Sequence, residues 1–210
     1  ALNPGPSLYY LTGLKFHLME RPTVLLLVPP AQPVLILPEL ELPKIPSARI
    51  SVTPFPFGDN PQQWEQAFKK AADYLRLRRK QIGVEPTRLR YLELSFLQKA
   101  AADARFVSGE IVFDRLRIQK DAGEIADMRR AAEIAGQALS ATLPMVKVGV
   151  SERELASELF VNLLRAGSDA ELPFAPIVAS GSNSANPHAT PSDRVLRSGD
   201  LILFDWGASY

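Results

Sequence analysis

The chain has 210 residues, 46% of them hydrophobic, which is enough for one large domain or two smaller ones. Its 24 Lys and Arg residues nearly balance 23 Asp and Glu residues, and a net charge of +1 gives no electrostatic basis for binding nucleic acid or an anionic membrane. The absence of cysteine excludes disulfides, thiol nucleophiles and thiolate metal ligands, so carboxylates and imidazoles are left for any metal site.

The apolar runs are short. The longest, 23–29 and 33–38, cannot span a bilayer. The chain also opens without a positively charged segment followed by an apolar one, the pattern that would mark it for export. We therefore expect a cytoplasmic protein with no membrane partner.

The first half is expected to contain short strands separated by proline and glycine. Predicted extended stretches are 8–11, 23–28, 34–37 and 50–53, and the second and third of these can form a hairpin around residues 29–33. Asn60 and Pro61 predict the start of a helix, because Asn caps helices and Pro suits the first helical position. Its apolar stripe is Trp64, Phe68, Ala71 and Leu75. The basic run 76–80 is interpreted as charge at the helix end.

A further strand at 88–94, a short helix at 95–104 and an extended stretch at 111–118 would complete an α/β unit. The domain boundary is predicted near Ile118, which gives domains 1–118 and 119–210.

Two capping boxes predict the helices that open the second domain. Asp121 with Glu124 begins the first helix, and Ser151 with Glu154 begins the second. The apolar face predicted for the first helix consists of Ile125, Met128, Ala132, Ala135 and Leu139, and that of the second of Leu155, Leu159 and Leu163. Gly167 is expected to end the second helix, and strands at 176–179 and 201–204 should be joined by a polar loop.

Two residues near the end of the chain have the chemistry of functional groups. His188 lies in the polar loop, and Asp205 follows an apolar run. An aspartate between Phe204 and Trp206 is costly to bury without a cation, a metal or several hydrogen-bond donors. The residues alone also fit local roles, in which Asp205 bonds its own backbone to turn the chain before Gly207 and His188 is a solvated loop side chain.

Three segments near the end of the chain form an ordered pattern: 179–188 (ASGSNSANPH), 191–194 (PSDR) and 199–208 (GDLILFDWGA). Shorter upstream matches are 3–4 (NP), 10–13 (YLTG), 20–22 (ERP), 116–117 (LR), Lys120, 124–125 (EI), 128–129 (MR) and Ala131. In order, spacing and residue type, this pattern resembles the Xaa-Pro dipeptidase (prolidase) and aminopeptidase P family of creatinase-type "pita-bread" metallopeptidases. The resemblance spans essentially the whole chain.

The resemblance implies an α/β N-terminal creatinase-type domain, with a mixed sheet and flanking helices, followed by the beginning of an α+β pita-bread catalytic domain. It implies metal-dependent hydrolysis of Xaa-Pro bonds in short peptides, with two divalent metal ions (Mn, Co or Zn). The family holds them with two Asp, one His and two Glu, and Asp205 matches the first Asp. His188 matches a histidine that contacts the substrate and stabilises the transition state. The four other ligands would lie beyond Tyr210, so we expect the chain alone to be inactive.

The family also implies a homodimer that acts on proline-containing peptides. In some relatives an N-terminal-domain residue reaches the partner subunit's active site, and His17 is a candidate for that role; a surface loop histidine is the alternative. Two other functions stay open: a metal-independent creatinase-like amidinohydrolase, and a non-catalytic pita-bread relative that binds proteins. Asp205 counts against the former, because those enzymes have a non-ligand residue there. Dipeptidase and aminopeptidase specificity are both open.

Overall fold

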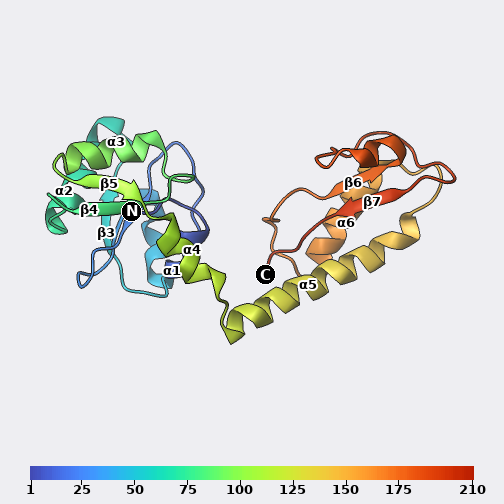
Figure 1. The fold of residues 1–210 in the computed structure, drawn as a ribbon, viewed down its shortest axis with the longest axis horizontal. Helices are drawn as coiled ribbons and strands as arrows, with labels where there is room; N and C mark the ends of the chain where they lie inside the picture. Colours follow the sequence, from blue (N-terminus) through green and yellow to red (C-terminus); the bar gives the residue numbers. More distant parts are fainter. The chain divides into compact units, whose positions relative to one another are not determined.

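The computed structural model describes residues 1–210, which divide into two compact units, Ala1–Gln119 and Lys120–Tyr210 (Figure 1). The strands of the first unit are β1 (Val24–Leu26), β2 (Val34–Pro38), β3 (Thr53–Phe57), β4 (Gln81–Val84) and β5 (Arg105–Ser108). Its helices are α1 (Pro6–Thr12), the 3-10 helix η1 (Glu39–Ser47), α2 (Pro61–Tyr74), α3 (Tyr91–Ala100) and α4 (Glu110–Ile118). None of the helices in either unit combines the length and apolar character that crossing a bilayer requires.

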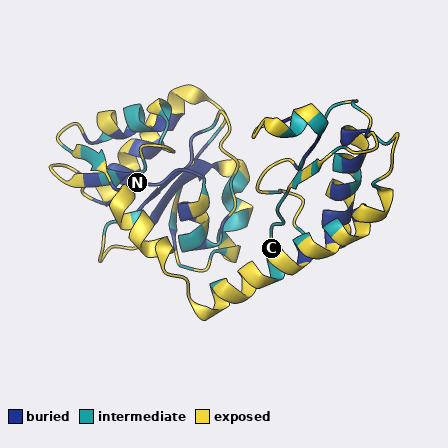
Figure 2. Ribbon diagram, turned by 45° about the vertical axis from the view of Figure 1, so that its right-hand side comes forward, coloured by how far each residue is buried: buried dark blue, intermediate teal, exposed yellow.

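The first unit is built on a mixed sheet of three strands. β1 pairs antiparallel with β2, which confirms the predicted hairpin, and β2 pairs parallel with β3. Every residue of β1 and β2 is buried (Figure 2). Alternate residues of these strands face two different hydrophobic clusters. Val24 and Ile36 pack with α2 and α3, whereas Leu25 and Leu35 pack with Leu8 of α1. Helices therefore cover both faces of the sheet.

Three predictions of extended structure in this unit are wrong. Residues 8–11 lie in α1, because Pro6 starts the helix and Gly13, with φ of 72°, ends it. Residues 111–118 lie in α4, where the amide groups of Val112 and Phe113 bond to the carbonyl of Gly109. Residues 88–94 mostly enter α3, which starts and ends earlier than the predicted helix 95–104.

The strand that precedes α3 is β4, which pairs parallel with β5. Neither strand was predicted, because each is only four residues long and Gly83 interrupts the apolar pattern of β4. The fourth predicted strand is also displaced, since β3 starts at Thr53, where the predicted stretch 50–53 was expected to end.

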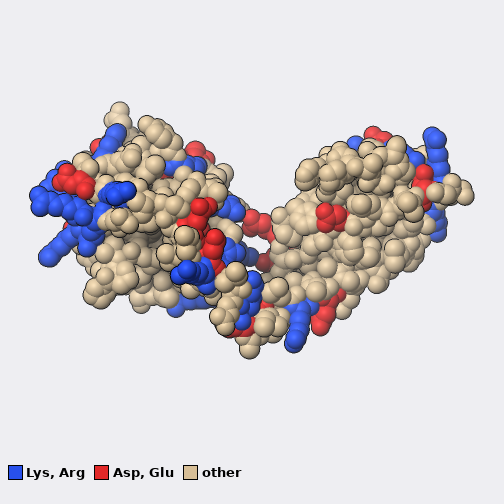
Figure 3. Space-filling model, viewed as in Figure 1, with Lys and Arg blue, Asp and Glu red and all other residues tan.

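The predicted helix at Asn60 is α2. The Asn60 side chain accepts a hydrogen bond from the Gln62 amide, and the four residues of the predicted stripe are all buried. The helix ends at Tyr74, so the basic run 76–80 follows the helix and does not belong to its last turn. Figure 3 shows Lys and Arg side chains gathered on the side of this unit that carries α2 and β4.

The second unit consists of α5 (Ala122–Thr142), the 3-10 helix η2 (Leu143–Met145), α6 (Glu152–Arg165), β6 (Ile177–Ser180), the 3-10 helix η3 (Gly181–Ala185) and β7 (Ile202–Asp205). Both predicted capping boxes are present. α5 packs against α6, and β6 pairs antiparallel with β7, with Ile177 opposite Asp205. The predicted face of α6 is correct, because Leu155, Leu159 and Leu163 are completely buried.

The predicted apolar face of α5 is wrong. Ile125 and Met128 are exposed to 40% and 58%, and the buried residues are Ile134, Ala138 and Thr142. The Thr142 hydroxyl donates to the Ala138 carbonyl, so this polar residue is satisfied inside the helix. The buried stripe on the C-terminal half of α5 contacts α6 through Ala138 and Thr142. The apolar residues in the N-terminal half of α5 are exposed and misled the prediction.

Replacing Ser151 with alanine should lower the free energy of unfolding of the second unit by about 1 kcal/mol, because Ser151 accepts the Glu154 amide at the start of α6. Urea denaturation followed by Trp206 fluorescence would measure this change. Ser140→Ala is the matched control, since Ser140 is exposed within α5. Equal midpoints for the two variants would contradict the role of the cap.

Candidate active site

Asp205 is the last residue of β7 and its side chain is exposed. The residues on either side anchor it: Phe204 packs with Leu155 on the helix side of the strand pair, and the Trp206 indole donates a hydrogen bond of 2.9 Å to the Ala135 carbonyl of α5. Because side chains alternate along a strand, Asp205 points to the opposite, open face. The core therefore fixes the direction in which this carboxylate points.

The carboxylate of Asp205 accepts no hydrogen bond and forms no ion pair. The local role considered from the sequence, a bond to its own backbone that turns the chain, is therefore not found. The chain passes close to Pro173 after Trp206, because a Cβ on Gly207 would lie 3.0 Å from the Pro173 Cγ. Only glycine allows this approach without a shift of the neighbour, and the free carboxylate remains available for a cation.

His188 lies in the loop that follows η3. Its backbone amide donates to the Asn186 Oδ1 at 3.0 Å, and the adjacent Ala189 is buried. The imidazole is exposed and makes no hydrogen bond or ion pair. The loop therefore holds the backbone of His188 and leaves its ring free to contact a ligand. No hydrogen bond or ion pair joins His188 to Asp205.

Glu152, the first residue of α6, lies beneath this loop and is completely buried. Its Oε1 accepts the Ser180 amide at 2.6 Å and the Ser180 hydroxyl at 2.9 Å. Its Oε2 accepts the Asn183 side-chain amide at 2.9 Å and the amide and hydroxyl of Ser192 at 3.1 and 2.7 Å. Five hydrogen bonds from three residues thus converge on one buried carboxylate.

Arg194 links this cluster to the segment before β7. Its guanidinium donates to the Ser180 hydroxyl and to both oxygens of Asp200, at 2.8 and 2.9 Å. Asp200 also accepts the Arg197 amide at 2.8 Å. A continuous chain of hydrogen bonds therefore runs from the start of α6 through the end of β6 to the start of β7.

The hydrogen bonds lower the pKa of both carboxyl groups. Burial opposes ionisation of Glu152, but the bonds from Ser192, Asn183 and Ser180 outweigh it and lower its pKa to about 2. The Arg194 side chain, followed by the Arg197 amide, lowers the pKa of Asp200 to about 2. Both groups are therefore ionised at neutral pH.

These pKa values predict acid sensitivity of the second unit. A carboxyl group whose pKa is lower in the folded state contributes stability above its unfolded pKa, and the contribution is lost as pH falls toward the folded pKa. The urea midpoint reported by Trp206 should therefore fall between pH 5 and pH 2.5. Asp200→Asn should make this fall shallower, because it removes one of the two groups. A midpoint that does not change over this range would contradict the assignment.

His17, the third predicted site residue, lies in the first unit. It is exposed, and its carbonyl accepts the Met19 amide at 3.1 Å. The Arg90 side chain donates to the Met19 carbonyl and also binds Glu93, which is completely buried in α3. The loop of His17 is thus tied to α3, and the imidazole itself has no partner.

The residues present do not by themselves fit a two-metal centre. Such a centre needs several carboxylate and imidazole ligands within a few ångströms of one another, and no group of three His, Cys, Asp or Glu side chains in this chain is placed to hold a metal ion. Asp205 supplies one free carboxylate. The side chains of this chain alone therefore do not form a metal site.

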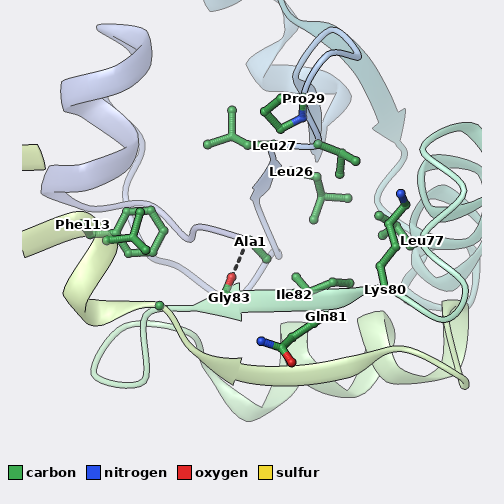
Figure 4. Close-up of a pocket in the computed structure, with 13 residues that line it drawn as sticks. Ala1, Leu26, Leu27, Pro29, Leu77, Lys80, Gln81, Ile82, Gly83 and Phe113 are labelled. Atoms are coloured by element: carbon green, nitrogen blue, oxygen red, sulfur yellow. Dashed lines mark hydrogen bonds between the residues drawn. The ribbon is translucent and has the colours of Figure 1, made fainter.

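A cavity of about 400 Å³ lies in the first unit between β1 and β4 (Figure 4). Apolar side chains such as Leu26, Ile82 and Phe113 dominate its lining, and the amino group of Ala1 donates to the Gly83 carbonyl at 2.7 Å. No predicted site residue lines it. Its lining is mostly apolar and brings no group of catalytic side chains together.

Comparison with known proteins identifies the chain. The creatinase/prolidase N-terminal domain model matches residues 2–119, and the model of metallopeptidase family M24 matches residues 126–210. The fold and these two matches therefore define an N-terminal creatinase-type domain joined to the first part of a peptidase domain. The chain belongs to the creatinase/prolidase family of M24 metallopeptidases, which confirms the resemblance and the expected fold classes.

Relatives of defined activity support this family. An Xaa-Pro dipeptidase of Pyrococcus horikoshii is 35% identical over 148 residues, 69% of this chain and 41% of its own length. A dipeptidase structure from the same organism is 32% identical with a TM-score of 0.85, covering 100% of this chain and 56% of that one. The structure of an X-Pro aminopeptidase from Thermotoga maritima is 27% identical with a TM-score of 0.79, and the match covers 97% of this chain and 55% of that one. The chain thus spans about half the length of these relatives.

Sequence reasoning missed Glu152 and Arg194. Glu152 was read only as part of the Ser151 capping box, and nothing in the sequence marks it as the acceptor for donors 28 to 40 residues further on. Arg194 was seen only as part of a family motif. The three-dimensional course of the loop, rather than local spacing, creates both roles.

Proposed function

We propose that the protein containing this chain hydrolyses the Xaa-Pro bond of short peptides in a metal-dependent reaction. The observation that carries the proposal is the Asp205 carboxylate, which is free, exposed and held rigidly between two anchored aromatic residues. The family match and the Xaa-Pro dipeptidase relative support this substrate class. In this proposal Asp205 binds a divalent metal ion, Mn, Co or Zn, and His188 donates a hydrogen bond to the peptide near the bond that is cleaved.

We further propose that the 210 residues alone are inactive and that the boundary near Ile118 separates the N-terminal domain from the catalytic domain. The single metal ligand and the coverage of about half of the relatives support inactivity. We also propose a cytoplasmic homodimer, in which His17 contacts the peptide in the partner subunit's active site. The exposed, unpaired imidazole of His17 supports this role, and light scattering would test the dimer.

The two alternatives differ from this proposal in what they require of Asp205. A metal-independent amidinohydrolase does not need a metal-binding carboxylate at this strand end, and a protein-binding relative does not need a catalytic histidine at position 188. Both groups are accessible here, and neither is used to stabilise the fold. These observations favour the peptidase.

The first measurement is the intact mass of the purified protein. A mass well above 23.1 kDa would mean that the polypeptide contains more than this sequence, and hydrolysis of Xaa-Pro dipeptides and longer Xaa-Pro peptides should then be assayed with and without Mn²⁺, Co²⁺ or Zn²⁺. Metal-dependent release of the residue before proline is the expected result. Hydrolysis of creatine without metal, or no hydrolysis in the longer polypeptide, would overturn the proposal. At 23.1 kDa we expect no activity.

A further inference from the structure

The loop of residues 181–193, which carries His188, is closed at its base by one side chain. Ser180 precedes the loop and Ser192 lies at its end, and both bond to Glu152 through their amides and their hydroxyls. Asn183 adds a further bond from within η3. The two ends of a segment that is otherwise largely exposed are therefore fixed to the first turn of α6.

The chemistry of this contact requires a carboxylate. Every group that faces Glu152 is a donor, and both carboxylate oxygens are used. A glutamine of the same shape would turn its amide group toward at least one N–H or O–H donor and leave that donor without an acceptor. An aspartate keeps the charge, but its side chain is one methylene shorter and cannot reach both ends of the loop equally well.

Arg194 extends the same connection to the strand of Asp205. Its guanidinium lies against Gly181, where a Cβ would stand 2.4 Å from the Arg194 Nη2 and φ is 52°. Glycine is therefore required at this position. Through Arg194, the hydroxyl of Ser180 is linked to Asp200 ahead of β7.

We propose that Glu152 is a positioning residue of the enzyme, which fixes the loop of residues 181–193 so that His188 is presented to the peptide in one orientation. The catalytic meaning of this inference rests on the proposed function, because it assumes that His188 contacts the substrate. The fixing of the loop depends only on the contacts of Glu152. Glu152 acts through His188 and does not itself touch the peptide.

Hydrogen exchange of backbone amides in this chain tests the fixing directly. In Glu152→Gln, amides of residues 180–193 should exchange at least about 10-fold faster, whereas those of Leu159 and Leu163 in the core of α6 should keep their protection. Glu154→Gln is the matched control, since Glu154 lies in the same helical turn and bonds only to Ser151. Unchanged exchange in the loop, or an equal increase in the core, would overturn the proposal.

Kinetics in the active enzyme test the positioning of His188. Glu152→Gln should lower kcat/KM for Xaa-Pro peptides by about 10- to 100-fold, mainly through kcat. In a His188→Ala background, Glu152→Gln should lower kcat/KM by less than about 2-fold, because a residue that acts through His188 has no side chain left to position. Equal losses in both backgrounds would show a general structural role and refute the inference.

The two proposals fail in different ways. If the unsubstituted enzyme does not cleave Xaa-Pro peptides, the proposed function fails and the positioning of a catalytic His188 fails with it. If the unsubstituted enzyme is active and Glu152→Gln has the same kcat/KM, only the role of Glu152 is refuted.

Discussion

If the proposed function is correct, replacing Asp205 with asparagine should lower the metal-dependent kcat/KM for Xaa-Pro peptides by at least about 100-fold, because the variant removes a negative charge from the proposed metal ligand. Asparagine has nearly the same shape, and Phe204 and Trp206 hold the strand end in place by contacts that do not involve the carboxylate. The fold should therefore persist, and metal affinity measured by calorimetry should fall together with activity.

Asp193→Asn is the control for this experiment. Asp193 is 85% exposed and pairs only with Arg153, at 2.8 Å, and exposed pairs of this kind contribute about 0–1 kcal/mol. The control should keep full activity and full metal affinity. If Asp205→Asn retained activity within about 3-fold of the unsubstituted enzyme, Asp205 would not be a metal ligand, and the metal-independent alternative would regain support.

The sequence predicts the second unit better than the first because its helices begin with local signals. Asp121 and Ser151 each bond to the amide three residues later, and these contacts need only a few neighbouring residues. The leucines of α6 also repeat at helical spacing and are buried. Local chemistry and tertiary packing agree in these helices, so the pattern is sufficient.

In the first unit, several elements of secondary structure depend on contacts with distant residues, and local sequence patterns do not predict them. β4 is a strand because β5 lies beside it, and the pairing partner is more than twenty residues away in the sequence. α4 has the β-branched residues Ile111, Val112 and Ile118, which favour a strand, but it forms a helix after Gly109. Such intrinsic preferences are worth less than about 1 kcal/mol per residue, and tertiary context overrides them.

Some residues of the candidate site were predicted from the sequence, and others were not. Asp205 and His188 were found because a family motif surrounds each of them, and the structure adds that both side chains are exposed and unpaired. Glu152 was not found, because its role depends on a loop that returns to α6 after 28 to 40 residues. Residues that hold a site in place are recognised by their contacts, which a single sequence does not contain.

Replacing Leu159 with alanine should lower the free energy of unfolding of the second unit by about 2–5 kcal/mol. Leu159 is completely buried and packs in one cluster with Ala138 of α5 and with Phe204 and Trp206, the two residues that flank Asp205. A cavity at this position removes contacts from both helices and from the strand end. Urea denaturation would measure the loss through Trp206 fluorescence, with Trp64→Phe to silence the only other tryptophan.

Leu164→Ala provides the comparison on the same helix, because Leu164 is 38% exposed and its truncation should cost no more than about 1 kcal/mol. Measuring metal affinity in the Leu159 variant also tests whether the packing of this cluster affects the orientation of Asp205 as well as the stability of the unit. If the cluster fixes the direction of Asp205, the surviving folded fraction of Leu159→Ala should bind metal more weakly in the active enzyme, whereas Leu164→Ala should bind it normally. A large loss of stability with unchanged metal affinity would show that Phe204 and Trp206 hold Asp205 without help from the helix packing beneath them.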